Sequence, residues 1–103
     1  MLIAWTTVAT RDKAEELAHT AIERHLAACV QVDGPLTSYY IWKGQPERAE
    51  EFRLCFKFLR SQQAGLEAWI FAHHPYDTPE WIVVQAEVVG EKYLSWAQTS
   101  SRF

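Results

Sequence analysis

The first half of the chain changes from a strand pattern to a helix pattern and back again. Residues 2–8 are a β-rich apolar run, and Thr10 with the acids after it supplies a helix N-cap and first turn. Apolar residues then recur at steps of three and four over residues 14–26, which predicts a helix with one buried face. Residues 28–42 return to β-type residues, and Asp33-Gly34-Pro35 predicts a bulge or bend within one long strand.

A hairpin is predicted around residues 43–46, because their Gly and Pro favour turns and are avoided in regular strands. The return strand is predicted at residues 50–59. Its apolar residues alternate with Arg53, Cys55 and Lys57, so one face is apolar and the other carries a thiol and an ammonium group. Chemistry is therefore expected on that second face.

The remaining elements complete an α+β arrangement. Ser61 is expected to cap a second helix, and Pro75 to end it, because proline disfavours helical geometry in the preceding residue. Residues 81–89 predict a strand, and residues 91–100 predict a short amphipathic helix. The order β-α-β-β-α-β plus a C-terminal helix is that of a ferredoxin-like split βαβ sandwich, with helices on one sheet face. We predict one such domain over residues 1–103, with self-association covering the surface that the helices leave open.

Composition and charge argue against several classes of function. The formal charge is -3 and the sequence pI is about 5.8, with the basic residues scattered, which argues against a nucleic-acid partner. No apolar run approaches the roughly 20 residues that span a bilayer, so we expect a cytoplasmic protein without membrane association. Five Trp, four Tyr and five Phe are more than one small core easily buries, which indicates contact with another subunit. The two cysteines are expected to be free thiols.

The densest chemistry lies in residues 73–80, where His73, His74, a phenol and two carboxylates stand among two prolines. Imidazole nitrogens bind Cu, Zn and Ni well, and carboxylates can complete a coordination shell. The alternative is a proline-rich connection whose histidines only end a helix. Spacing alone leaves both open, because the segment contains neither two histidines one helical turn apart nor a Cys-x-x-Cys pair.

The other candidate residues also have structural alternatives. Cys29 lies in apolar company and can be a small buried hydrophobe, and Lys57 can bind an anion or extend its ammonium group to the surface. Trp42 can line a ligand pocket or form a subunit contact. The isolated glycines form no phosphate-binding motif, and we expect the protein not to be an enzyme. The weakest hypothesis is an enzyme with Cys29 as nucleophile and His74 as base.

Four motifs, in matching order and spacing over nearly the whole chain, make it resemble the CutA family of divalent-cation tolerance proteins. They are Leu26-Ala27-Ala28-Cys29-Val30, the hairpin residues 38–44 with Lys57 on the following strand, His74-Pro75-Tyr76 through Pro79-Glu80, and Tyr93-Leu94-Ser95-Trp96. The resemblance implies a ferredoxin-like subunit, a tight homotrimer that pairs strands across subunits, and Cu(II) or another divalent cation bound in some members. The chain departs from the family pattern at Phe58 and Asp77, and Thr6 or Thr7 stands where some members have a cysteine ligand.

The resemblance also implies two sets of site residues. The implied metal ligands are His73, His74 and, as a possible third, Cys29; the implied pocket between subunits contains Tyr39, Trp42, Lys57 and Glu80. The function expected first is divalent-cation tolerance, or metal homeostasis, by a trimer that binds Cu(II) or a similar cation through histidine. The alternative is a trimeric scaffold or sensor that binds a small anion or a partner protein at the cleft between subunits.

Overall fold

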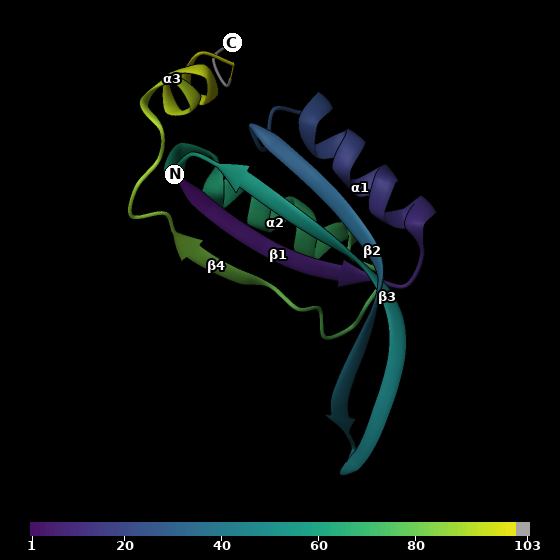
Figure 1. Ribbon diagram of the computed structural model, residues 1–103. Helices are drawn as coiled ribbons and strands as arrows, with labels where there is room; N and C mark the ends of the chain where they lie inside the picture. The colour runs from purple at the N-terminus through teal and green to yellow at the C-terminus, as the bar shows by residue number, and fades with distance from the viewer. Residues whose placement is uncertain (101–103) are drawn as a thin grey trace.

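The computed structural model describes residues 1–100 and combines a four-stranded sheet with three α-helices (Figure 1). The elements are β1 (Leu2–Val8), α1 (Arg11–Glu23), β2 (Cys29–Trp42), β3 (Gln45–Phe58), the 3₁₀ turn η1 (Arg60–Gln62), α2 (Gln63–His73), β4 (Ile82–Gln85) and α3 (Glu91–Ser100). The predicted order of strands and α-helices is confirmed. No helix among the described residues is both long and apolar enough to cross a membrane.

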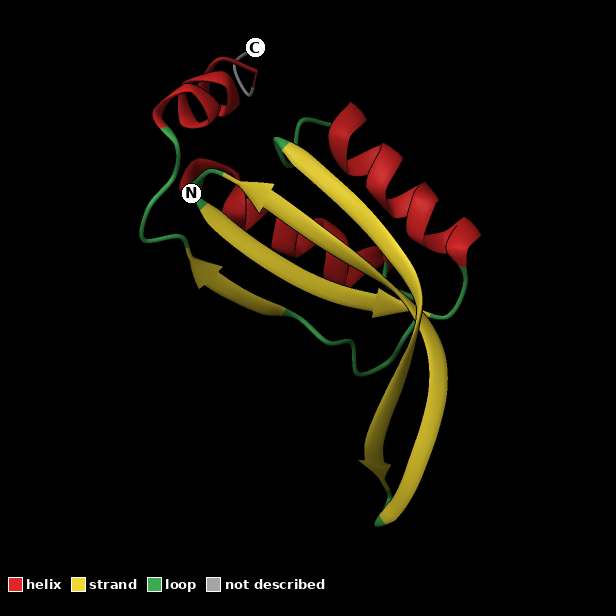
Figure 2. Ribbon diagram, in the orientation of Figure 1, coloured by secondary structure: helices red, strands yellow, loops and turns green. Residues whose placement is uncertain are grey.

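The sheet is antiparallel throughout, with the strand order β2-β3-β1-β4. Helices α1 and α2 lie on one face, as Figure 2 shows. Alternate residues of the two central strands point into this layer: Ala4 of β1 pairs with Phe56 of β3, and both are completely buried. Leu17 of α1 and Leu66 of α2 are buried in the same core. The alternation that predicts an apolar face on β3 is therefore confirmed.

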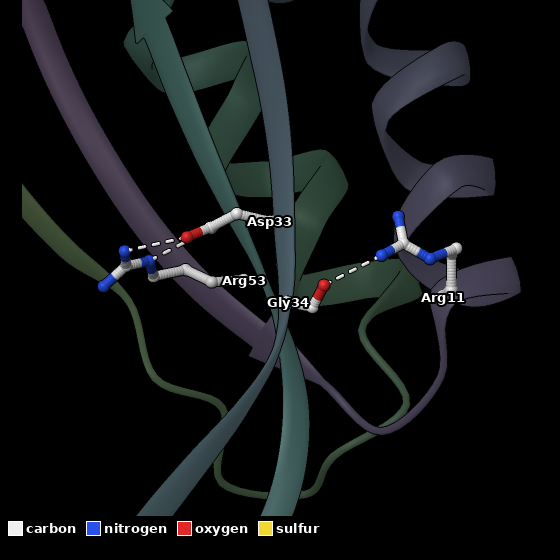
Figure 3. Close-up of polar contacts among 4 residues, drawn as sticks. All are labelled: Arg11, Asp33, Gly34 and Arg53. Carbon is white, nitrogen blue, oxygen red and sulfur yellow. Dashed lines mark hydrogen bonds and ion pairs between the residues drawn. The ribbon is translucent and has the colours of Figure 1, made fainter.

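The β2–β3 hairpin is long and bent, and its distal half extends beyond the rest of the molecule (Figure 1). The register between the strands shifts between Asp33 and Leu36, at the predicted bend. Gly34 adopts φ +139°, a conformation open essentially to glycine alone. Two arginines lie beside the bend (Figure 3): Arg53 donates two hydrogen bonds, at 3.3 and 3.0 Å, to the Asp33 carboxylate, and Arg11 donates to the Gly34 carbonyl at 2.9 Å.

Strand β3 begins at Gln45, five residues before the predicted start. The hairpin continues its backbone pairing to Trp42 and Gln45, although the distal residues have no core to pack against. Backbone hydrogen bonds do not depend on side-chain polarity, so residues 45–49 form a strand without alternating burial. The prediction was wrong there because it relied on hydrophobic periodicity.

Three other predicted boundaries are wrong. Helix α1 ends at Glu23, and Leu26, the last apolar residue of the predicted pattern, lies in the connection to β2. Ser61 does not cap α2; the chain enters that helix through η1, where the Gln62 Oε1 accepts the Leu59 N–H at 2.9 Å. Strand β4 ends at Gln85, not at residue 89, because its partner β1 begins at Leu2 and Leu2 pairs with Gln85. Past that pair, a single hydrogen bond from the Ala86 N–H to the Met1 carbonyl continues the contact.

Candidate functional site

His74 connects the end of α2 to the C-terminal end of β1. Its Nε2 lies 2.9 Å from the Thr6 Oγ1 and 3.0 Å from the Thr7 carbonyl oxygen, and its Nδ1 accepts the Tyr76 N–H at 3.0 Å. A carbonyl can only accept and a backbone N–H can only donate, so the hydrogen-bond network assigns the proton to Nε2. Both ring nitrogens are therefore occupied, and neither has a lone pair free for a metal ion.

Lowering the pH is expected to destabilise the metal-free protein through His74. Burial lowers the pKa of His74 below its usual value near 6.5, although its hydrogen bond to Thr7 opposes the shift. Below about pH 6.5, the unfolded chain gains a proton at this imidazole before the folded chain does. Stability from His74 is therefore present above that pH and is lost as the pH falls. Urea unfolding in EDTA at pH 7.5 and 5.5 measures the effect.

The pH-dependent loss of stability should be smaller in His74→Gln than in the unchanged protein. His19→Gln is the matched control, because His19 is exposed on α1 and, within residues 1–100, pairs only with Glu23 one helical turn later. An equal pH dependence in His74→Gln and the unchanged protein would contradict the assignment of this effect to His74.

His73 has a different environment, although it is the next residue in the chain. Its Nδ1 lies 2.9 Å from the Trp69 carbonyl, one helical turn back, and its ring stacks on the Trp69 indole with the centroids 5.4 Å apart. The carbonyl requires the proton on Nδ1, which leaves the lone pair on Nε2. Nε2 makes no hydrogen bond to any residue in the described part of the chain. His73 is thus the histidine of the pair that has a nitrogen available for a cation.

Cys29 lies away from both histidines in this chain. It pairs with Lys57, which pairs in turn with Ile3 near the start of β1, whereas His74 contacts Thr6 and Thr7 at the other end of that strand. Along β1, the three or four residues from Ile3 to Thr6 or Thr7 span roughly 10 Å. The spacings from β1 to β3 and from β3 to β2 add to the distance between Cys29 and His74. Within residues 1–100, no group of three or more His, Cys, Asp or Glu side chains is placed to hold a metal ion. One chain therefore does not bring the three implied metal ligands together.

The implied pocket residues are also distributed over the molecule. Tyr39 and Trp42 lie on the distal part of the hairpin and are 76% and 51% exposed. Lys57 lies near the other end of β3, with its Nζ 5.9 Å from the centre of the Tyr93 ring. Tyr39 pairs with Arg48 of β3. Lys57 is nine residues further along the same strand, a length of roughly 30 Å. A pocket containing all of them requires more than one copy of the chain.

Glu80, the fourth implied pocket residue, faces a buried acid that the sequence analysis does not identify. Glu51 is 8% exposed and accepts a hydrogen bond from the Tyr76 hydroxyl at 2.9 Å. Burial raises the pKa of the Glu80 carboxyl and the charge of Glu51 raises it further, while Arg53 opposes the shift. Burial and the bond to Glu51 also raise the pKa of the Tyr76 hydroxyl. No sequence signal marks Glu51, because it follows another acid just before the apolar alternation begins.

Both cysteines are free thiols, and Cys55 lies on the face of β3 that the sequence analysis predicts to carry a thiol. Cys29 and Cys55 are free and half-buried. Cys55 lies on the uncovered sheet face, beside a depression of about 390 Å³ that Trp5, Gln31 and Arg53 also line. Burial raises the pKa of Cys55, with Lys57 opposing, so this thiol is less acidic than usual.

Comparison with known proteins gives consistent results over almost the whole chain. The family model described as CutA1 divalent ion tolerance protein matches residues 2–100. A protein of Yersinia pestis named divalent-cation tolerance protein CutA is 35% identical over 99 residues, covering 96% of this chain and 83% of that protein.

Solved structures with this name have the same fold. The CutA of Synechococcus elongatus superposes with a TM-score of 0.93 at 35% identity, covering 98% of this chain and 89% of that one. The CutA1 of Oryza sativa superposes with a TM-score of 0.92 at 32% identity, covering 98% and 93%.

Proposed function

Because this chain belongs to the CutA1 family of divalent ion tolerance proteins, we propose that it serves divalent-cation tolerance or metal homeostasis by binding Cu(II) or a similar cation through histidine. The observation that carries the proposal is the free Nε2 of His73, in a ring whose Nδ1 is held by the Trp69 carbonyl. Histidines that bind metals usually make such a second hydrogen bond, which orients the ring and fixes the tautomer. Imidazole nitrogen is also a donor that Cu(II) prefers.

We propose further that ferredoxin-like subunits of this chain form a homotrimer. Strands β2 and β4 are the two edges of the sheet, and their outer backbone groups are available to pair with another copy. The exposed aromatic residues of the hairpin, among them Tyr39 and Trp42, support the same conclusion. In such an assembly, these side chains of one copy would lie beside Lys57 and Glu80 of another, which would complete the implied pocket.

A catalytic role is not part of the proposal. The hypothesis of a thiol enzyme needs Cys29 and His74 within hydrogen-bond distance of each other. In this chain Cys29 is level with the start of β1, across β3, whereas His74 contacts the end of β1, and the Nδ1 of His74 already accepts the Tyr76 N–H. This separation supports a binding protein.

Cu(II) titration of histidine variants tests the proposed function. His73→Gln is expected to weaken Cu(II) binding at least about tenfold, since it removes the one available imidazole of the pair. His74→Gln should leave the affinity nearly unchanged, because both its ring nitrogens serve the fold. Isothermal titration calorimetry measures both affinities, and light scattering of the same samples measures the mass of the assembly.

The control is His19→Gln, which removes an exposed histidine from a different helix. Equal affinities in His73→Gln and the unchanged protein would overturn binding through this residue. A trimer that binds no copper would retain the proposed assembly and favour the scaffold or sensor alternative.

A further inference from the structure

A cavity of about 180 Å³ is lined by residues of both α1 and α2, the two helices that cover one face of the sheet (Figure 2). His73 and Trp69 line it from the last turns of α2. Lys13, Glu16, Leu17 and Thr20 line it from α1, and Arg24 lines it from the C-cap of that helix. Steps of three and four residues place the polar members along one side of the helix. The cavity thus brings the available histidine next to a polar stripe of the other helix.

The two walls supply two kinds of metal donor. The Nε2 lone pair is the one electron pair of the His73 ring that can bind a metal ion, because Nδ1 carries the proton and donates it in a hydrogen bond to the Trp69 carbonyl. The Glu16 carboxylate is 65% exposed, and its ion pair is with Lys13, whose Nζ lies 3.6 Å from the Glu16 Oε2. An exposed ion pair of this kind contributes little free energy, so the Glu16 carboxylate can exchange Lys13 for another cation at little cost.

We propose that Glu16 and His73 form a divalent-cation site that bridges α1 and α2. The protein ligands are the His73 Nε2 and a Glu16 carboxylate oxygen, and water completes the coordination shell. One nitrogen and one oxygen donor suit Cu(II), Ni(II) and Zn(II). This inference rests on the proposed function of His73, but it assigns Glu16, and neither His74 nor Cys29, as the second ligand within one chain.

Two basic residues set the strength of the site. Lys13 competes with the metal ion for Glu16, and Arg24 adds positive charge to the same cavity. Both raise the free energy of placing a divalent cation there. Removing the Lys13 charge should therefore strengthen binding, an effect opposite in sign to that of removing a ligand.

Cu(II) titration of three α1 variants tests the assignment. Glu16→Gln is expected to weaken binding at least about tenfold, whereas Lys13→Gln should strengthen it about two- to fivefold, the value of one exposed ion pair. Glu15→Gln is the matched control, because Glu15 is the adjacent exposed acid and its ion pair, 3.8 Å to Arg11, lies outside the cavity. It should leave the affinity unchanged. All three positions are on the surface of α1, and thermal unfolding in EDTA confirms that each variant is folded.

The outcomes separate this inference from the function on which it rests. Binding that is weakened in His73→Gln but unchanged in Glu16→Gln overturns the α1–α2 site and leaves the histidine proposal intact. Binding unchanged in both variants overturns both proposals. Weaker binding in Lys13→Gln would also contradict the site, because it would make Lys13 a contributor to binding and not a competitor.

Discussion

Replacing Phe56 with alanine is expected to lower the free energy of unfolding by about 3–5 kcal/mol. Phe56 is completely buried at the centre of the sheet, where it pairs with Ala4 on β1 and Val30 on β2. Its ring also packs against Trp81, with the centroids 5.6 Å apart. Truncation removes these contacts and leaves a cavity that the paired strands cannot close. Chemical denaturation at a fixed protein concentration measures the loss.

Phe71→Ala is the matched control, since it deletes the same atoms from the outer side of α2. Phe71 is 54% exposed and contacts Trp81 only edge-on. Its truncation should cost about 1 kcal/mol, because much of its surface is already in water. Equal losses for the two variants would mean that Phe56 does not occupy a central position in the core.

Gly34→Ala is expected to destabilise the protein by about 2–4 kcal/mol, from backbone strain together with overpacking. Its φ of +139° is strained for any residue with a Cβ. A Cβ at this position would lie 2.9 Å from the Phe52 Cδ1, 3.0 Å from the Glu51 carbonyl oxygen and 3.1 Å from the Phe52 Cα. Two of these atoms belong to the backbone of β3, so the hairpin itself would have to shift. Chemical denaturation again measures the loss.

Two other glycines separate strain from steric conflict. Gly44, in the hairpin turn, has φ +77°, but an added methyl group would meet no atom within 4 Å, so Gly44→Ala should cost only about 1–2 kcal/mol of strain. Gly90 has neither constraint, and Gly90→Ala should be nearly neutral. A loss in Gly34→Ala no larger than that in Gly44→Ala would show that the close approach to β3 does not matter.

The fold was predictable wherever a buried face generates a periodic pattern. Helix α1 and its N-cap are confirmed, with the Thr10 hydroxyl accepting the Lys13 N–H, although the helix ends at Glu23 and not at residue 26. Strand β1 and helix α3 begin and end at the predicted residues. The errors at residues 45–49 and 86–89 have one physical origin, because there the partner strand, and not burial, determines where pairing starts and stops.

The site was less predictable, because residue type does not reveal which neighbours already occupy each polar atom. His73 and His74 look equivalent in sequence, yet one bonds to its own helix and the other to β1. Glu16 resembles any exposed helical acid until α2 is placed beside it. The contact of Tyr76 with Glu51 joins residues 25 positions apart, which no local pattern records.

The strand order also sets the sequence of events during synthesis. β2 and β3 are neighbours in the chain and can pair as soon as both have left the ribosome, which makes their contacts local and fast to form. β1 is the first of the four strands to be made, but it lies between β3 and β4. One edge of β1 therefore stays unpaired until residues 52–58 are made, and the other until residues 82–85 are made. Until the last of these appear, the oldest strand of the nascent chain keeps an open edge that another chain can pair with. Interrupted translation or C-terminal proteolysis before residue 82 would therefore yield a fragment prone to aggregation.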